Sequence, residues 1–265
     1  LAGNPGFNLP KPAVAQLYGV QQYATVATAQ TPASLPDITT SFTPAERTMV
    51  ADRILARCDA LDGSTDGMVL DVKACQGAFS PANAVPACSG ARDGSCLTAD
   101  QKTAIGNIFR GARNGAGQAL YASFPLDPGI RGNDWAGWEF NNAPFLDPMA
   151  VGYVFTSPPA QPAVPTGLLA YALNFSMDSD APKIFATDAT YTESAMSFMT
   201  PPNPSDMSTL RNRGAKLMVY HGTADGVFSP DDTAAWYEAL SAAHGGDASN
   251  FARYYPVPGM NHCSG

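Results

Sequence analysis

The sequence predicts an α/β protein, because strand-like and helical patterns alternate near its C-terminal end. Residues 216–220 form an apolar run that is typical of a buried strand. Residues 231–244 have the spacing of an amphipathic helix, with Asp231 or Asp232 expected near its N-terminal cap. A second apolar run then leads into the Pro/Gly-rich segment 255–259. This order predicts two strands joined through one helix.

A carboxylate and a histidine follow these two predicted strands. Asp225 lies on the loop after the first strand, and His262 lies on the Pro/Gly loop after the second. Strand, Asp loop, helix, strand and His loop is the order in which α/β-hydrolases place the acid and the base of a Ser-His-Asp triad. A lone loop histidine usually has no catalytic role, but this order and the adjacent Cys263 favour one. We therefore expect an α/β-hydrolase core with Asp225 as acid and His262 as base.

The third member of such a triad is not found by motif. No serine of the chain has glycine at both positions −2 and +2, as a Gly-x-Ser-x-Gly turn requires. The first residues resemble a strand end and a turn, without a start methionine or a signal segment. We expect the nucleophilic serine to lie upstream, outside this chain, and the chain alone to be inactive. Without those upstream strands, residues 216–220 are expected to lack neighbours.

Composition excludes some partners. The chain has 265 residues, 45% of them hydrophobic, which is enough for a substantial core. Its net charge of -8 and its pI near 4.7 argue against nucleic acid as a partner. The longest apolar stretches are too short to span a membrane.

Five cysteines indicate an oxidising compartment. Cys58 with Cys75 and Cys88 with Cys96 form two close pairs without C-x-x-C spacing, which favours local disulfides over reduced, buried thiols. We therefore expect a secreted or periplasmic protein. Cys263 is left over, so its partner is expected near the missing nucleophile.

The chain divides into three parts by pattern. Residues 1–9 are expected to end the first part of the α/β-hydrolase core, and residues 204–265 to carry its acid and base. Residues 10–203 between them are expected to form a large, disulfide-stapled lid. Within this lid, helices are predicted at 43–58 and 98–109, each opening with a threonine followed three residues later by Glu or Gln. Most of the rest is expected to be loop.

An acidic loop beside Cys58 predicts a cation site. Asp59, Asp62 and Asp66 are crowded into a short segment with two glycines. Hard oxygen ligands on such a loop are typical of calcium sites, although the spacing is not that of an EF-hand. The alternative is a solvated acidic turn. Repulsion among the carboxylates favours a bound Ca²⁺.

Several motifs together resemble the tannase and feruloyl esterase family, nearly from end to end of the chain. The matching segments are Ala2-Gly-Asn-Pro-Gly6, Cys58-Asp-Ala-Leu-Asp-Gly63, His221-Gly222 with Asp225, and Val257-Pro-Gly-Met-Asn-His-Cys-Ser-Gly265. The resemblance implies a serine-type carboxylic ester hydrolase that acts on esters of aromatic acids. It also implies the acid and base already named, and a disulfide from Cys263 to an upstream segment. The implied calcium ligands are Asp59, Asp62, Asp66 and the main-chain oxygens of Ser64 and Met68.

The resemblance also implies substrate contacts. In family members that hydrolyse terephthalate monoesters, a lid arginine binds the free carboxylate and a phenylalanine four residues later stacks on the ring. By spacing these positions hold Tyr171 and Phe175, with His221 and Phe228 at the edge of the pocket. Tyrosine carries no positive charge, so a small neutral or phenolic ester is the expected substrate, of feruloyl, galloyl or terephthalate type. Core packing is the alternative for Phe175.

Two other functions remain open from the sequence. One is a different acyl hydrolase or transferase that uses the same triad. The other is a calcium-stabilised extracellular binding module without catalytic activity.

Overall fold

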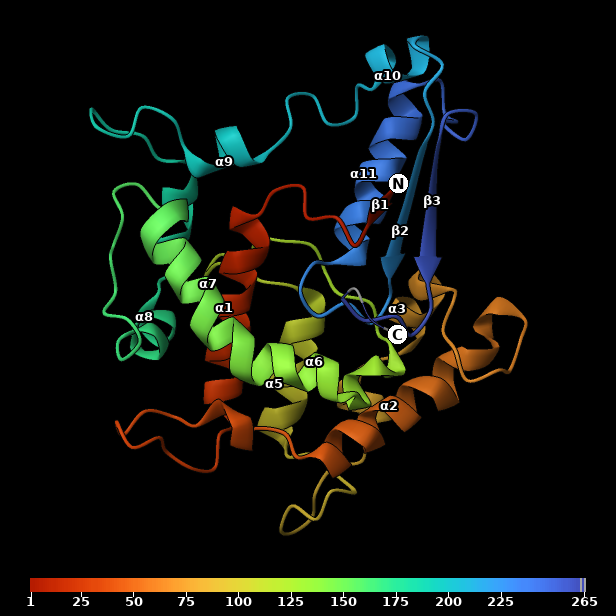
Figure 1. Cartoon of the computed structure of the whole chain (residues 1–265). Helices are drawn as coiled ribbons and strands as arrows, with labels where there is room; N and C mark the ends of the chain where they lie inside the picture. Colours follow the sequence, from red (N-terminus) through yellow and green to blue (C-terminus); the bar gives the residue numbers. More distant parts are fainter. Residues whose placement is uncertain (263, 265) are drawn as a thin grey trace.

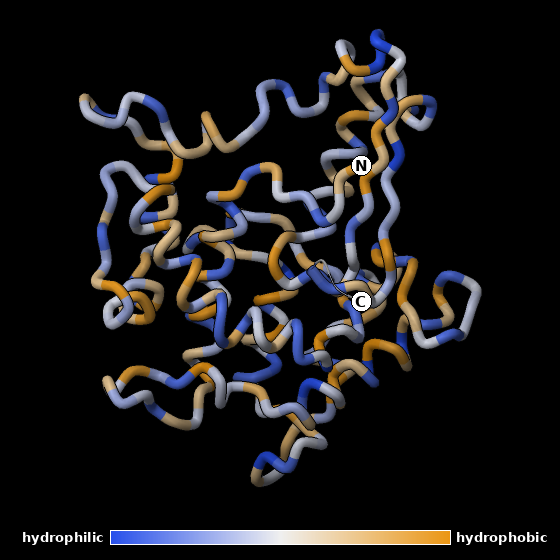
Figure 2. Tube along the Cα trace, viewed as in Figure 1, coloured by the Kyte–Doolittle hydropathy of each residue, from blue (hydrophilic) through white to orange (hydrophobic). Residues whose placement is uncertain are grey.

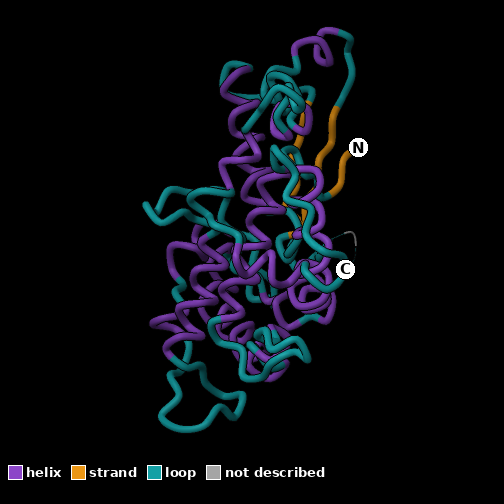
Figure 3. Tube along the Cα trace, turned by 90° about the vertical axis from the view of Figure 1, so that its left-hand side faces the viewer, coloured by secondary structure: helices purple, strands orange, loops and turns teal. Residues whose placement is uncertain are grey.

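A computed structural model describes residues 1–262 and residue 264. The strands lie together with α10 and α11 on one side of the molecule, and most of the other helices form a larger body beside and below them (Figure 1). Turned by a quarter, the molecule is narrow, and the strands gather in its upper half while helices fill the lower part (Figure 3). Within the described residues, no helix is both long and apolar enough to cross a membrane.

The elements follow one another in a mainly helical order. The strands are β1 (Ala2–Gly3), β2 (Leu217–Gly222) and β3 (Ala252–Val257). The α-helices are α1 (Pro10–Ala24), α2 (Pro44–Cys58), α3 (Val72–Ala78), α4 (Pro81–Ala84), α5 (Ala99–Arg110), α6 (Asn133–Gly137), α7 (Ala143–Ala150), α8 (Leu168–Asn174), α9 (Ala195–Met199), α10 (Ser208–Asn212) and α11 (Pro230–Ala243). Short 3₁₀ turns are η1 (Ile38–Thr40), η2 (Asp59–Asp62), η3 (Pro128–Arg131) and η6 (Ala181–Phe185), and π turns are η4 (Trp138–Asn142) and η5 (Val151–Phe155).

The sheet is parallel, with β2 between β1 and β3. β2 and β3 end together, with Gly222 opposite Val257, so the loops that follow them leave from the same edge. The expectation that residues 216–220 lack neighbouring strands is wrong. The first residues of the chain supply β1 on one side, and the strand before the His loop supplies β3 on the other.

The helix between β2 and β3 confirms the predicted connection, with one correction. α11 begins at Pro230, and its N-cap is Ser229, whose hydroxyl accepts the N–H of Asp231. The helix thus begins one residue before the predicted Asp231. Asp231 and Asp232, expected near the cap, lie in the first turn, where a carboxylate interacts favourably with the helix dipole. The serine one step earlier takes the cap because Pro230 fits the first helical position.

Both helices predicted in the middle of the chain are confirmed. α2 and α5 begin with complete capping boxes, Thr43 with Glu46 and Thr98 with Gln101. Outside these two helices, most of residues 10–203 is loop or turn, as expected, but α1, α7 and α8 are helices that the sequence did not predict. α1 contains two prolines in its first turn and has no side-chain cap, so the usual start signal is absent.

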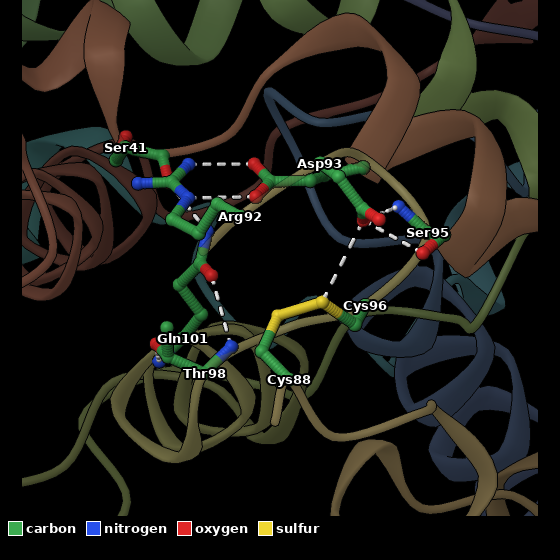
Figure 4. Close-up of a disulfide and its surroundings, with 9 residues drawn as sticks. Ser41, Cys88, Arg92, Asp93, Ser95, Cys96, Thr98 and Gln101 are labelled. Carbon is green, nitrogen blue, oxygen red and sulfur yellow. Dashed lines mark hydrogen bonds and ion pairs between the residues drawn. A yellow bond between two sulfur atoms is a disulfide. The ribbon is translucent and has the colours of Figure 1, made fainter. Parts of the chain in front are cut away.

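The two expected local disulfides are present. Cys58 is bonded to Cys75 and Cys88 to Cys96, with Cα–Cα distances of 5.1 and 5.0 Å. Figure 4 shows the second disulfide beside Arg92 and Asp93. Each bridge closes a short loop of the helical body and limits the freedom of that loop in the unfolded chain.

The apolar side chains form a large cluster among the helices and a smaller one behind the sheet. The smaller cluster contains Val219 from β2, Trp236 and Leu240 from α11, and Phe251 before β3. Hydrophobic residues recur at intervals along the helices rather than in one block (Figure 2). This spacing is what buries one face of each helix and leaves the other in water.

Candidate active site

Asp225 and His262 meet beyond the carboxyl edge of the sheet. The Nδ1 atom of His262 lies 2.9 Å from Oδ2 of Asp225. The other carboxylate oxygen accepts the backbone N–H groups of Val227 and Phe228 at 2.7 and 3.1 Å. Asp225 is 2% exposed, so its carboxylate is held in one orientation by buried donors.

A second histidine lies behind this carboxylate. The Nε2 atom of His221 is 3.1 Å from Oδ2 of Asp225 and 3.0 Å from the carbonyl oxygen of Phe228. Both partners are acceptors, so Nε2 carries the proton, and Nδ1 accepts from the hydroxyl of Thr233 at 2.8 Å. His221 is fully buried. It therefore supports Asp225. The sequence had predicted His221 at the edge of the substrate pocket, and it does not line the pocket beside His262.

The pKa values of the pair move in opposite directions. Burial disfavours the charged carboxylate of Asp225, but the hydrogen bonds from His221 and His262 outweigh it and hold the pKa of Asp225 below its usual value. The hydrogen bond to Asp225 raises the pKa of His262 above its usual value, against a smaller effect of burial. Asp225 is thus anionic at neutral pH, and Nδ1 of His262 donates to it. This leaves Nε2 of His262 as the nitrogen that can act as a base.

A pocket of about 310 Å³ lies beside His262. Trp138 and Asn142 of η4 contribute to its wall, together with the loops after β2 and β3. The ring of Trp138 is 6.5 Å from the ring of His262, and Phe228 packs edge-on against the same ring at 5.3 Å. Within the described residues, the buried Nε1–H of Trp138 has no hydrogen-bond acceptor. The imidazole therefore lies near two aromatic side chains, one of which, Trp138, has an unused donor.

Sequence reasoning did not find Trp138 or Asn142. They lie in a stretch that was expected to be loop, and no periodicity or spacing connects them with His262. Proximity of two tryptophans, Trp135 and Trp138, was the one available signal. The π turn η4, which lies directly before α7, places the second of them at the pocket.

The model of the family described as tannase and feruloyl esterase matches residues 11–265. This chain belongs to the tannase and feruloyl esterase family. Mono(2-hydroxyethyl) terephthalate hydrolase of Piscinibacter sakaiensis is 37% identical to it over 289 residues, which cover 100% of this chain and 47% of that protein. Probable feruloyl esterase B-1 of Neosartorya fischeri is 25% identical over 232 residues, which cover 86% of this chain and 40% of that protein.

Solved structures of family relatives share the fold. An esterase from Aspergillus oryzae superposes with a TM-score of 0.72 at 22% identity, over 100% of this chain and 46% of that one. The tannin acyl hydrolase from Aspergillus niger gives a TM-score of 0.62 at 18% identity, over 99% of this chain and 47% of that one. The predicted α/β class with an α/β-hydrolase type of core is thereby confirmed. The chain spans about half the length of the relatives that it matches.

Tyr171 and Phe175, the substrate contacts inferred from the family spacing, lie apart from the pocket beside His262 in this structure, and their contact with substrate stays a prediction. Both are at α8, which Figure 1 shows across the helical body from the C terminus. Phe175 is 4% exposed within the large hydrophobic cluster, and Tyr171 packs edge-on against it at 5.8 Å. Neither lines the pocket beside His262. Core packing, the alternative for Phe175, is what the structure shows, because residue spacing cannot anticipate how the helices fold over one another.

The acidic loop has donors of the type that calcium prefers, but they do not converge in this structure. Asp59 accepts the N–H groups of Asp66 and Gly67, and Asp62 accepts those of Ser64 and Leu70. Over residues 1–262 and 264, no three His, Cys, Asp or Glu side chains lie close enough together to hold a metal ion. The three carboxylates of the loop therefore serve as backbone acceptors here. The calcium site stays a prediction.

Cys263, the predicted link to an upstream segment, lies outside the described residues. Its neighbours are defined: Asn261 and Ser264 form an isolated bridge, and the hydroxyl of Ser264 donates to Asp134 at 2.9 Å. The link itself stays a prediction.

Proposed function

We propose that this chain supplies the acid and the base of a serine-type carboxylic ester hydrolase that acts on esters of aromatic acids. The contact between Asp225 and His262 carries the proposal. It joins an anionic, buried carboxylate to a histidine whose Nε2 is left available at a pocket. This is the arrangement that activates a serine nucleophile.

In this mechanism Nε2 of His262 takes the serine proton as the serine oxygen attacks the ester carbonyl. It then gives that proton to the leaving alcohol. Asp225 stabilises the imidazolium that forms in between, and His221 holds Asp225 in place. The serine lies in the upstream part of the protein, because no Gly-x-Ser-x-Gly motif occurs in this sequence. In the second half of the reaction, a water attacks the acyl-serine ester while Nε2 of His262 takes its proton. His262 then returns that proton to the serine oxygen, and the free aromatic acid leaves.

Aromatic acids are the proposed acyl groups for two reasons. Trp138 and Phe228 put two aromatic side chains near the base. The relatives are named as hydrolases of feruloyl and terephthalate esters. Among the described residues that line the pocket there is no lysine or arginine. We therefore favour neutral or phenolic esters over substrates with a free carboxylate.

The calcium and disulfide predictions belong to this proposal. The Ca²⁺ ligands would be the side chains of Asp59, Asp62 and Asp66 and the main-chain oxygens of Ser64 and Met68. To bind the ion, the carboxylates would give up hydrogen bonds that they now accept from backbone N–H groups. Cys263 would join the His loop to the cysteine before the serine in the upstream segment. The two local disulfides support an oxidising compartment, secreted or periplasmic.

Activity of the full-length protein tests the function. His262→Ala should lower kcat for methyl ferulate or a comparable ester by about three or more orders of magnitude, as loss of a triad base does. His244→Ala is the matched control, since this histidine contacts Arg211 at the far end of α11. Near-normal turnover by His262→Ala refutes the proposal. A wild type that binds aromatic esters without cleaving them would support the binding-module alternative instead.

Peptide mapping under non-reducing conditions tests the link. Recovery of Cys263 joined to the residue before the serine supports it. A free Cys263 thiol in the active enzyme contradicts it.

A further inference from the structure

Asp127 is a buried carboxylate of the helical body that reaches the catalytic loops. It is 3% exposed and lies between α5 and η3. Its Oδ1 accepts the N–H of Gly129 at 2.7 Å and so caps η3. This oxygen has a local structural role, and the other oxygen of the carboxylate does not take part in it.

The second oxygen joins two loops. Oδ2 of Asp127 accepts the hydroxyl of Thr223 at 2.5 Å and the backbone N–H of Gly259 at 3.2 Å. The same N–H lies 3.1 Å from the Thr223 hydroxyl oxygen. Thr223 precedes Asp225 on the loop after β2, and Gly259 precedes His262 on the loop after β3. One carboxylate oxygen thus contacts the loop of the acid and the loop of the base together.

Close packing surrounds this contact. A side chain at Gly129 would meet the Cβ of Ala224 at 2.3 Å, so η3 lies directly against the acid loop. The two loops also bond to each other, with the N–H of Ala224 donating to the carbonyl of Met260 at 3.1 Å. Asp127 adds to this pair an acceptor from a third element, which a direct loop-to-loop bond cannot replace.

We infer that Asp127 is a positioning residue: through Thr223 and Gly259 it fixes the loop of Asp225 and the loop of His262 relative to each other, and ties both to the helical body. The inference rests on the proposed function. The hydrogen bond between Asp225 and His262 joins side chains of different loops, so its length follows the relative position of those loops. A displacement of about 1 Å at a catalytic group can lower a rate by about 100-fold.

The test compares Asp127→Asn with Asp37→Asn in the full-length enzyme. Both aspartates cap a 3₁₀ turn through the N–H two residues later, but among the described residues the side chain of Asp37 forms hydrogen bonds only within its own turn. In Asp127→Asn an amide can keep the cap but turns its N–H₂ toward the N–H of Gly259. We expect kcat to fall about 10- to 100-fold with KM changed by less than about threefold. Asp37→Asn should keep both constants.

The pH profile separates positioning from general stability. Asp225 raises the pKa of His262, so a looser pair should move the acidic limb of kcat/KM to lower pH. A variant that is merely less stable would lose active protein without moving this limb. Thr223→Val should shift kcat and the limb in the same direction, and it serves as the measurement if Asp127→Asn does not fold.

Wild-type kcat and an unmoved limb in Asp127→Asn, or in Thr223→Val if only that variant folds, overturn the inference. An equal loss in Asp37→Asn also overturns it. His262→Ala distinguishes this failure from failure of the proposed function. If His262→Ala is inactive while Asp127→Asn is unaffected, the function stands and only the role of Asp127 is wrong.

Discussion

At the residue scale, one series of hydrogen bonds determines which nitrogens of His221 and His262 carry a proton. Thr233 donates to His221, His221 donates to Asp225, and His262 donates to the same carboxylate oxygen. The two acceptors at Nε2, Asp225 Oδ2 and the carbonyl oxygen of Phe228, fix the tautomer of His221, and the Thr233 hydroxyl then donates to Nδ1. Asp225 therefore receives two imidazole N–H groups, and its negative charge remains available to the base when substrate arrives. The fully buried His221 contacts Asp225 and does not line the pocket beside His262.

Asn142 offers a change of specificity by one residue. It is exposed and lines the pocket beside His262, where no cation is found among the described lining residues. Asn142→Arg should shift preference toward esters with a free carboxylate by about 10- to 150-fold in kcat/KM, which corresponds to roughly 1.5–3 kcal/mol for a new charge-assisted contact. Paired assays on a neutral ester and its free-acid analogue measure the shift.

Tyr171→Arg is the control for this prediction, because Tyr171 lies at α8 outside the pocket. It should leave the ratio of the two substrates unchanged. A shift with Tyr171→Arg but none with Asn142→Arg would mean that the substrate enters from the α8 side.

At the scale of single elements, the start of α2 is held by charge as well as by its cap. Glu46 belongs to the capping box, and its two carboxylate oxygens also accept Nε and Nη2 of Arg92 at 2.7 and 2.6 Å. Arg92 further donates to the carbonyl of Ser41 at 3.0 Å, a contact visible beside the disulfide in Figure 4. Despite the burial of its side chain, which disfavours charge, bonds from Arg92 and Thr43 hold the pKa of Glu46 below its usual value.

Removing this arginine should be costly. Arg92→Ala leaves the fully buried carboxylate of Glu46 without its cation, and about 3 kcal/mol of unfolding free energy should be lost. The unfolding free energy of Arg92→Lys should lie between those of wild type and Arg92→Ala, since an ammonium group keeps the charge but cannot form the two paired hydrogen bonds. Urea unfolding measures the change, and Lys73→Ala, from an exposed pair with Glu238, should leave the midpoint unchanged. Equal midpoints for Arg92→Ala and wild type would show that the pair adds nothing.

Chelation tests the acidic loop after α2. If Ca²⁺ binds the folded loop only, removing it with EGTA should lower Tm, and added Ca²⁺ should restore Tm in a concentration-dependent way. Asp59→Asn with Asp62→Asn should abolish this dependence on Ca²⁺, while Asp100→Asn in α5 should keep it. An unchanged Tm together with no bound metal by elemental analysis would leave the loop as a solvated turn.

At the scale of the whole molecule, acidic groups are buried between the helical body and the sheet. Glu139 is 5% exposed, and its Oε2 accepts the hydroxyl of Tyr23 at 2.8 Å. Burial raises the pKa of Glu139 to about 8, the bond from Tyr23 opposes this, and the charge of Asp225 adds to it. Burial likewise raises the pKa of Asp147 well above its usual value. The helical body therefore keeps the neutral acid of Glu139 close enough to Asp225 for the charge of Asp225 to act on it.

This burial makes stability depend on pH. Since the folded pKa of Glu139 lies above the unfolded one, the folded state holds a proton that the unfolded state loses between about pH 4.5 and 8. The contribution of Glu139 to the unfolding free energy is fully present at acid pH and is lost as pH rises. The loss is roughly 2–3 kcal/mol between pH 5 and pH 7. Glu139→Gln should thus raise Tm at pH 8 more than at pH 5.

The exposed Glu193 is the control, and Glu193→Gln should shift Tm equally at both values of pH. The same Tm gain for Glu139→Gln at pH 5 and pH 8 would contradict the assigned proton.

Local physics by itself determined much of this protein. The capping boxes at Thr43 and Thr98 involve residues three apart, and the two disulfides join cysteines close in sequence, so the sequence reveals them directly. The positions of Asp225 and His262 follow from a strand, a helix and a strand, because parallel strands end at one edge of a sheet. Hence the contact between Asp225 and His262 could be predicted without a structure.

Only the tertiary structure decided what surrounds this pair. Trp138 reaches the pocket, His221 turns behind Asp225, and Asp127 joins both loops because separate elements pack together. Phe175 enters the core instead of the pocket for the same reason. No sequence period or cap records such contacts, because they depend on how the elements pack rather than on the order of residues within each element.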